Sequence, residues 1–278
     1  MGLKEKKQRL VGILEAYDAL AVAFSGGVDS TFLLAVAKDV LGEHVLAITA
    51  TSAIHPRTES LAAAEIAKAL GVTQRVVSSH EMDLPEFVAN PSNRCYVCKR
   101  HVMAEVVRIA AEMGITHVAH GVNVDDLGDF RPGLKAAQEM GLLSPLVAAG
   151  LTKADIRALS RRMGLSTWNK PSMACLASRI PYGTAITPEN LRMVEEAEDF
   201  LHGRGFAGCR VRHHGAVARI ELARRDIKKA LTEPARTAIV WRMREIGFRF
   251  VAVDLEGYVM GSLNRALEQG VEKLRLRP

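Results

Sequence analysis

The sequence contains no hydrophobic run long enough to cross a membrane. Its longest apolar segments, such as Ala19–Phe24 and Val45–Ile48, are far shorter than the ~20 residues that a transmembrane helix needs. The lysine-rich residues 1–10 are not followed by the apolar segment of a signal peptide. We therefore expect a cytoplasmic protein that has no membrane partner.

The sequence also lacks any block of five or more residues of like charge. The 37 Lys and Arg residues outnumber the 31 Asp and Glu residues, and the net charge of +6 suits an anionic ligand such as a nucleotide, a phosphate or RNA. An ordinary solvated surface explains this charge equally well, so charge alone does not indicate a protein that binds nucleic acid. The 48% of hydrophobic residues excludes a disordered chain.

Cysteine is scarce, which argues against a fold held by disulfides. The four cysteines are Cys95, Cys98, Cys175 and Cys209, and in a cytoplasmic chain they favour metal or catalytic chemistry. Cys95 and Cys98 form a Cys-x-x-Cys pair just before a predicted helix. Cys209 lies in a segment of alternating polarity and is expected to be structural.

Three thiolates, those of Cys95, Cys98 and Cys175, can hold a 4Fe-4S cluster with one iron left open to bind an additional sulfide. A zinc site would also suit these thiolates, with a fourth ligand from His101 or His120. A redox pair, free catalytic thiols and inert cysteines are equally compatible with the spacing.

Short apolar runs alternate with helical patterns in the first part of the sequence. This alternation is typical of βαβ units, which form a parallel sheet covered by helices on both faces. We expect strands over Ala19–Phe24, Val45–Thr51, Gln74–Ser78 and Thr116–Gly121, and helices over Ser30–Leu41, Glu59–Leu70, Lys99–Met113 and Lys153–Met163.

The pattern changes after the poorly periodic segment Ser166–Tyr182. A helix is expected from Pro188 to about His202, with Thr187 as its N-cap. Strands over Gly208–His213, Val217–Leu222 and Arg249–Asp254 and helices over Arg225–Leu231 and Pro234–Ile246 follow. We thus expect an α/β protein: a Rossmann-like doubly wound parallel sheet in residues 1–165, a linker and cysteine loop in 166–186, and a smaller α+β domain in 187–278.

The segment Ser25-Gly26-Gly27-Val28-Asp29-Ser30 joins the first predicted strand to the first predicted helix. Two glycines let the backbone approach an anion closely, and the helix start offers N–H groups and the positive end of its dipole. The segment has neither the Walker A lysine nor a Gly-x-Gly-x-x-Gly pattern. It therefore predicts a phosphate-binding loop of another type.

This loop resembles the PP-loop of the ATP pyrophosphatase superfamily. The resemblance implies that ATP is cleaved between its α and β phosphates, that an acceptor oxygen is adenylated, and that the loop holds the pyrophosphate. Magnesium (Mg2+) is expected at Asp29, because a hard cation prefers carboxylate oxygen. The residues expected to contact ATP are Ser25, Gly26, Gly27, Asp29, Ser30, Thr51, Gly121, Asp125 and Arg131; Asp125 and Arg131, like Asp129, are alternatively loop scaffolding.

Four longer stretches resemble the LarE family of ATP-dependent sulfur transferases, which build the nickel-pincer nucleotide cofactor of lactate racemase. They are Phe24–Ser30, Gly121–Gly133, Lys170–Gly183 and Arg210–His213. The resemblance implies that a ring carboxylate of a pyridinium biscarboxylate mononucleotide is adenylated by ATP. A sulfur nucleophile then displaces AMP, giving a thiocarboxylate, and a second round gives the bisthiocarboxylate.

The family resemblance implies two routes for the sulfur. Some members give up the sulfur of the cysteine that matches Cys175; others have cysteines matching Cys95, Cys98 and Cys175 and are thought to hold a cluster that carries sulfide. Because this sequence has all three cysteines, the cluster route is favoured. A cluster-bound Cys175 cannot also be donated, so a sulfide or another sulfur donor is then needed.

The second domain is expected to bind the 5′-phosphate of the substrate. Arg210 and Arg212 alternate along a strand and so point to one face, where two guanidiniums suit a phosphate; two surface arginines would show the same pattern. The other expected substrate residues are Ser178, Arg179, Glu198 and Glu221, and the two glutamates either bind a metal or orient the arginines. Tyr96 stacks on the pyridinium or serves packing.

Three other functions stay open on the sequence alone. A tRNA 2-thiolation enzyme would need an added RNA-binding domain or a strongly basic surface, neither of which is evident. A synthetase domain of an amidotransferase would not need three cysteines, and a nucleotide sensor would bind ATP without turnover. The family resemblance also implies a homo-oligomer, and no nucleic acid partner is expected.

Overall fold

The computed structural model of the chain describes residues 2–128, 132–171, 174–259 and 261–265, which divide into two compact units. Unit 1 comprises Met1–Leu84 and Asn93–Met173, and unit 2 comprises Pro85–Ser92 and Ala174–Pro278. A short early segment thus belongs to the C-terminal unit, because the backbone of Val88 and Asn90 is hydrogen-bonded to that of Ile186 and Gly183.

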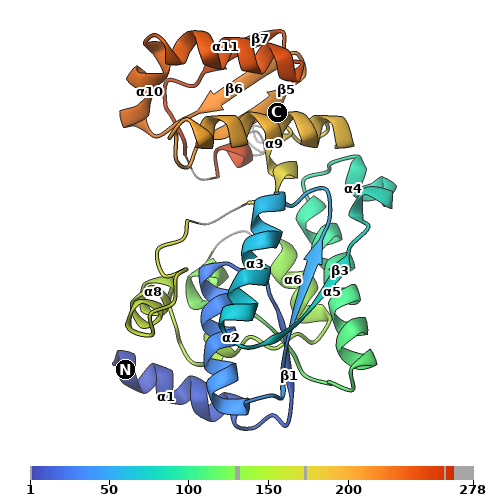
Figure 1. Cartoon of the computed structure of the whole chain (residues 1–278). Coiled ribbons are helices and arrows are strands. Elements are labelled where there is room, and N and C mark those ends of the chain that lie inside the picture. Colours follow the sequence, from blue (N-terminus) through green and yellow to red (C-terminus); the bar gives the residue numbers. More distant parts are fainter. Residues whose placement is uncertain (1, 129–131, 172–173, 260, 266–278) are drawn as a thin grey trace, which may run out of the picture. The chain divides into compact units, whose positions relative to one another are not determined.

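A parallel four-stranded sheet forms the centre of unit 1 (Figure 1). Its strands lie in the order β3-β2-β1-β4, and β1 pairs with both β2 and β4. The strands are β1 (Leu20–Ala23), β2 (Val45–Thr51), β3 (Thr73–Ser78) and β4 (Val118–His120). The helices are α1 (Leu3–Leu14), α2 (Val28–Leu41), α3 (Arg57–Ala69), α5 (Arg94–Glu112), α6 (Pro132–Glu139), α7 (Pro145–Ala148) and α8 (Lys153–Arg162).

Both faces of this sheet are buried, as a parallel sheet requires. Successive residues of β1 point to opposite faces, so Val22 packs with α2 while Ala21 packs with α5. Helices α1, α2, α3, α7 and α8 belong to the first core, and α5 and α6 to the second. Figure 1 shows α2 and α3 on one side of the strands and α5 on the other.

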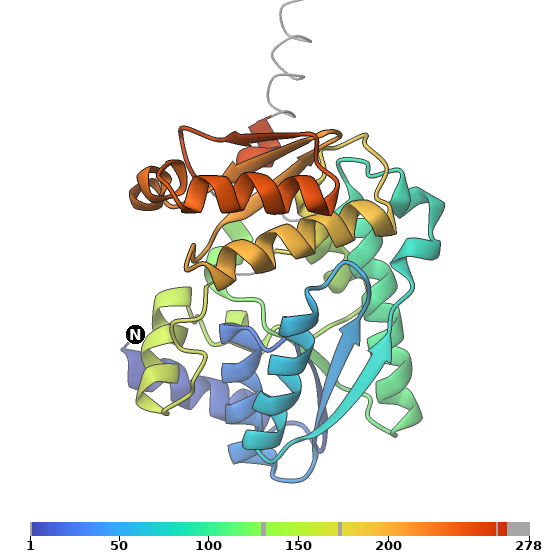
Figure 2. The same cartoon turned by 45° about the horizontal axis from the view of Figure 1, so that its top comes forward.

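Unit 2 contains a three-stranded mixed sheet in the order β5-β6-β7. Strand β5 (Arg210–His214) is antiparallel to β6 (Val217–Glu221), and β6 is parallel to β7 (Phe250–Val253). Helices α9 (Pro188–Gly203) and α11 (Ala235–Ile246) run side by side (Figure 2) and share one core with the inward residues of the strands. The unit also contains α4 (Pro85–Val88) and α10 (Arg224–Leu231).

The predicted α/β class with a smaller mixed sheet is confirmed. Strand β2 has the predicted bounds, and the side chains of Thr152 and Thr187 cap α8 and α9 as predicted. One boundary was wrong. Helix α5 begins at Arg94 rather than Lys99, so Cys95 and Cys98 lie in its first turns, not before it. The sequence analysis also assigned no helix to Leu3–Leu14, where Leu10 and Leu14 are buried one turn apart.

The backbone after β4 lies against the start of α2. A Cβ added at Gly121 would lie 2.7 Å from the backbone nitrogen of Ser30 and 3.1 Å from the carbonyl carbon of Asp29. A side chain at this position would therefore push the two segments apart.

Replacing Gly121 with alanine is expected to lower the free energy of unfolding by about 1–3 kcal/mol, the usual cost of overpacking. The control Gly12→Ala, in α1, meets nothing within 4 Å, and helix propensity should raise the free energy of unfolding by about 0.5–1 kcal/mol. Urea unfolding curves measure both. Equal stability of the two variants would contradict the close approach at Gly121.

Candidate active site

The predicted phosphate loop lies between β1 and α2, where it forms a compact turn. Gly26 has a positive φ of 67°, and a Cβ there would lie 3.0 Å from the Cα of Ala63 in α3, so only glycine fits easily. The hydroxyls of Ser25 and Ser30 are 3.2 Å apart, and the N–H of Gly27 donates to Ser25 Oγ at 3.4 Å. These bonds hold the turn closed over the start of α2.

The first turn of α2 is a suitable anion site. Gly27 is the N-cap of this 14-residue helix, and among the described residues no side chain caps it. The N–H groups of the first turn and the positive end of the helix dipole therefore face the loop.

Two lysines that the sequence analysis did not single out lie at this loop. Lys170 donates to the Gly26 carbonyl at 3.1 Å and to Glu59 of α3 at 2.7 Å. Lys153, the first residue of α8, forms an ion pair with Asp29. Lys170 belongs to a stretch that resembles the LarE family, whereas no local signal marks Lys153. Their ammonium groups can compensate the charge of a bound polyphosphate.

The segment after β4 contributes further groups to the same place. Asn123 donates through Nδ2 to Asp29 Oδ1 at 3.3 Å, and Asp125 accepts from the backbone N–H of Lys153 at 2.8 Å. Gly121 touches Ser30, so the predicted residues of the loop, Gly121 and Asp125 come together in unit 1. Thr51 ends β2. The predicted contact Arg131 lies outside the described residues, as does Asp129.

The donors around Asp29 are oxygens, as magnesium prefers. The Asp29 carboxylate meets the amide of Asn123 and the ammonium of Lys153, so a cation there would displace or share the lysine contact. In the described part of the chain no group of three or more His, Cys, Asp or Glu residues is arranged to hold a metal ion.

The Cys-x-x-Cys pair occupies the start of α5. Cys95 is exposed and Cys98 half-buried, and their spacing of three residues places them on one side of the helix. Cys98 Sγ lies 3.9 Å from an oxygen of Glu81, a fully buried carboxylate that accepts from Ser79 Oγ at 3.0 Å. Burial lowers the pKa of the neighbouring Lys99, and Cys98 partly opposes this shift.

Two predicted neighbours of the pair have other contacts. The Tyr96 hydroxyl donates to Glu139 at 2.6 Å, and this bond raises the Tyr96 pKa. The buried His120 shares a hydrogen bond of 2.8 Å with Ser144, and burial lowers its pKa to about 4. The His120 imidazole is therefore neutral at pH 7.

Cys175 belongs to unit 2, where it precedes the 3₁₀ turn Leu176–Arg179. Its carbonyl accepts from Ser178 Oγ at 2.7 Å and from Arg179 at 3.1 Å. The fully buried Arg179 also forms a two-bond ion pair with Glu198 of α9, at 2.9 and 2.8 Å. Burial acts to lower the pKa of Arg179, but the Glu198 carboxylate more than offsets this, so the pKa is raised.

The two arginines of β5 are buried rather than on the surface. Arg212 donates to Glu221 of β6 at 2.7 Å and to the Ser178 carbonyl at 3.0 Å. The Arg210 guanidinium lies 5.3 Å from the centre of the Tyr258 ring, and burial lowers its pKa. All six predicted substrate residues thus lie in unit 2, together with Cys175.

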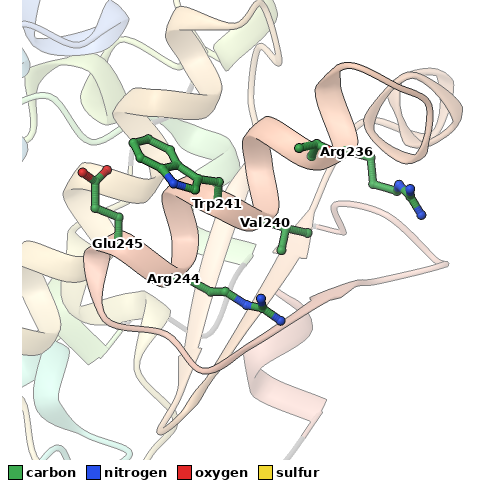
Figure 3. Close-up of a pocket in the computed structure, with 6 residues that line it drawn as sticks. Arg236, Val240, Trp241, Arg244 and Glu245 are labelled. Carbon is green, nitrogen blue, oxygen red and sulfur yellow. The ribbon is translucent and has the colours of Figure 1, made fainter.

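Two other features of unit 2 lie apart from these residues. Cys209 is fully buried, and burial raises the pKa of its thiol to about 12, so it stays a neutral thiol at pH 7. A surface hollow of about 540 Å³ lies on α11, where Trp241 is exposed (Figure 3). None of the predicted site residues lines it.

Across the described residues, the helices are too short or too polar to pass through a bilayer. The family model described as asparagine synthase matches residues 14–93, which contain the phosphate loop. A GMP synthase (glutamine-hydrolyzing) of Aeropyrum pernix is 30% identical over 66% of this chain and 39% of its own length.

Two relatives match nearly the whole chain. An uncharacterized protein of Synechocystis sp. is 40% identical over 95% of this chain and 99% of its own length. The pyridinium-3,5-bisthiocarboxylic acid mononucleotide synthase of Lactiplantibacillus plantarum is 37% identical over 95% of this chain and 96% of its own length. These findings confirm the family predicted from the sequence: the chain belongs to the pyridinium-3,5-bisthiocarboxylic acid mononucleotide synthases, the LarE family of ATP-dependent sulfurtransferases with a PP-loop domain.

Proposed function

We propose that the chain inserts sulfur into a pyridinium biscarboxylate mononucleotide, as a step in building the nickel-pincer nucleotide cofactor of lactate racemase. The name of the Lactiplantibacillus plantarum relative supports the pyridinium bisthiocarboxylate product. The geometric observation that carries the proposal is the loop of residues 25–30, which presents the start of α2 and two lysines to one anion.

The first step is adenylation. A ring carboxylate of the substrate attacks the α-phosphate of ATP, the bond to the β-phosphate breaks, and pyrophosphate leaves. The loop N–H groups, Lys153 and Lys170 bind the leaving pyrophosphate and stabilise its growing charge. Asp29 would hold Mg2+, which supplies further charge compensation when bound.

The second step is sulfur transfer. A sulfur nucleophile attacks the acyl-adenylate, AMP leaves, and a thiocarboxylate forms; a second round converts the other carboxylate. Cys95, Cys98 and Cys175 would hold a 4Fe-4S cluster, which when bound supplies an open iron able to carry a transferable sulfide. The shared side of α5 on which Cys95 and Cys98 lie fits two such ligands. Donation of the Cys175 sulfur itself is the second route.

The substrate phosphate is assigned to unit 2. Arg210 and Arg212 lie on the same face of β5 and suit a phosphate monoester. Residues 1–165 would serve ATP, 166–186 the sulfur loop, and 187–278 the substrate and the contacts of a cytoplasmic homo-oligomer.

Replacing Lys170 with methionine should lower substrate-dependent formation of AMP and pyrophosphate about 100-fold, the usual effect of removing one group that stabilises transition-state charge. The control Lys38→Met removes a lysine of α2 that pairs with Glu43, and should leave the rate unchanged. The assay measures AMP and pyrophosphate with ATP and the pyridinium mononucleotide. A wild-type chain that forms neither product would overturn the proposed function.

Iron and acid-labile sulfide analysis after anaerobic reconstitution decides between the sulfur routes. We expect about four iron atoms per wild-type chain and their loss in Cys95→Ala. The matched control Cys209→Ala should keep its iron, because a buried neutral thiol is not a ligand. A wild-type chain without iron that loses the mass of one H₂S on turnover would instead establish donation by Cys175.

A further inference from the structure

The strongest charge pair of unit 2 joins the cysteine loop to helix α9. The Arg179 side chain is 0% exposed and that of Glu198 is 5% exposed. Arg179 Nε and Nη2 each donate to one oxygen of Glu198, at 2.9 and 2.8 Å. Breaking such a pair would leave a charge buried without compensation, so the two residues move together.

The remaining nitrogen of Arg179 holds the backbone around the sulfur-bearing residue. Nη1 donates to the carbonyls of Ala174 and Cys175 at 2.8 and 3.1 Å, and to Ser178 Oγ at 2.9 Å. Ser178 Oγ in turn donates to the Cys175 carbonyl at 2.7 Å. Because all three guanidinium nitrogens bond to protein groups, Arg179 is better suited to position Cys175 than to contact a substrate.

Two hydrogen bonds connect this assembly to strand β5. Glu198 Oε1 accepts from the backbone N–H of Val211 at 3.0 Å, and Val211 stands between Arg210 and Arg212. Arg212 Nη1 donates to the Ser178 carbonyl at 3.0 Å, while its Nη2 donates to Glu221. The strand expected to bind phosphate is thus joined to the Cys175 loop at both Glu198 and Ser178.

We propose that Arg179 and Glu198 are positioning residues that couple an anion bound by Arg210 and Arg212 to the exposure of the Cys175 thiol. This inference rests on the proposed function for the role of Cys175 in sulfur transfer. A phosphate competes with the Ser178 carbonyl for Arg212 Nη1 and so releases one of the two connections. The Arg179–Glu198 pair keeps the loop attached to β5, and the loop therefore shifts as a unit.

Alkylation of Cys175 tests this coupling. The full chain, reduced and stripped of iron, is treated with iodoacetamide with and without inorganic phosphate at matched ionic strength, and the modified peptides are measured by mass spectrometry. In the wild type we expect phosphate to change the rate at Cys175 about fivefold or more, the low end of coupling between two sites. An unchanged rate at Cys175 would overturn the proposal.

Variants assign the response. Glu198→Gln weakens the pair and should remove the phosphate effect, whereas Glu196→Gln, on the same helix but paired with Arg192 and Arg242, should retain it. Lys170→Met weakens anion binding at the unit 1 loop and should also retain it. Retention of the full effect in folded Glu198→Gln, or its loss in Lys170→Met, would refute the coupling.

A double variant covers the case in which Glu198→Gln does not fold. Arg179→Met with Glu198→Met replaces the buried pair by apolar groups and leaves no charge unpaired. Its near-ultraviolet circular dichroism and its melting temperature establish folding. We expect a folded protein whose Cys175 rate ignores phosphate; a folded double variant that still responds would refute the coupling.

Isotope exchange between pyrophosphate and ATP separates this inference from the proposed function. Glu198→Gln should keep substrate-dependent exchange within about twofold of wild type, since the loop of residues 25–30 is unchanged, yet lose thiocarboxylate formation; equal loss of both would refute a positioning role. If the wild type shows no exchange, the proposed function fails, and the alkylation result alone then decides the coupling.

Discussion

The close approach of the backbone after β4 to the first turn of α2 is the constraint on which the nucleotide site depends. Gly121 permits this approach because a Cβ there would collide with the Ser30 nitrogen. The approach brings Asn123 and Lys153 to Asp29, and it places the Asp125 carboxylate at the start of α8. A single missing side chain thus lets two helix N-termini and their polar groups meet at one end of the sheet.

The charge pairs of the two units differ in a way that fits their proposed roles. In unit 1, the pairs Lys153–Asp29 and Lys170–Glu59 have side chains that are 17–36% exposed, and partly exposed pairs exchange partners at little cost. In unit 2, Arg179 and Glu198 are almost fully buried, so separating them is costly. The first kind of pair suits residues that yield to a polyphosphate, and the second suits a fixed support beneath a reactive thiol.

Local sequence signals predicted the features that local physics determines. Apolar runs located every strand, and Thr152 and Thr187 announced their helices because a threonine side chain caps the helix that follows it. Helix α5 begins after Asn93, whose side chain makes no capping bond, so its start carried no comparable signal. The burial of Arg212 and its pairing with Glu221 follow from strand register, as the position of Lys170 beside Gly26 follows from tertiary folding, and neither can be derived from neighbours in the sequence.

Coupling phosphate binding to Cys175 would answer a chemical problem that the proposed reaction creates. An acyl-adenylate is open to attack by water, and a reactive sulfur exposed before the substrate arrives is open to oxidation. A loop that moves only when the substrate phosphate reaches β5 would present the sulfur at the time it is needed. Arg179 and Glu198 suit this task because they connect the carbonyl of Cys175 to the backbone of Val211 through bonds that are all within unit 2. The coupling therefore needs no contribution from the nucleotide loop, and adenylation and sulfur presentation can be separated by substitution.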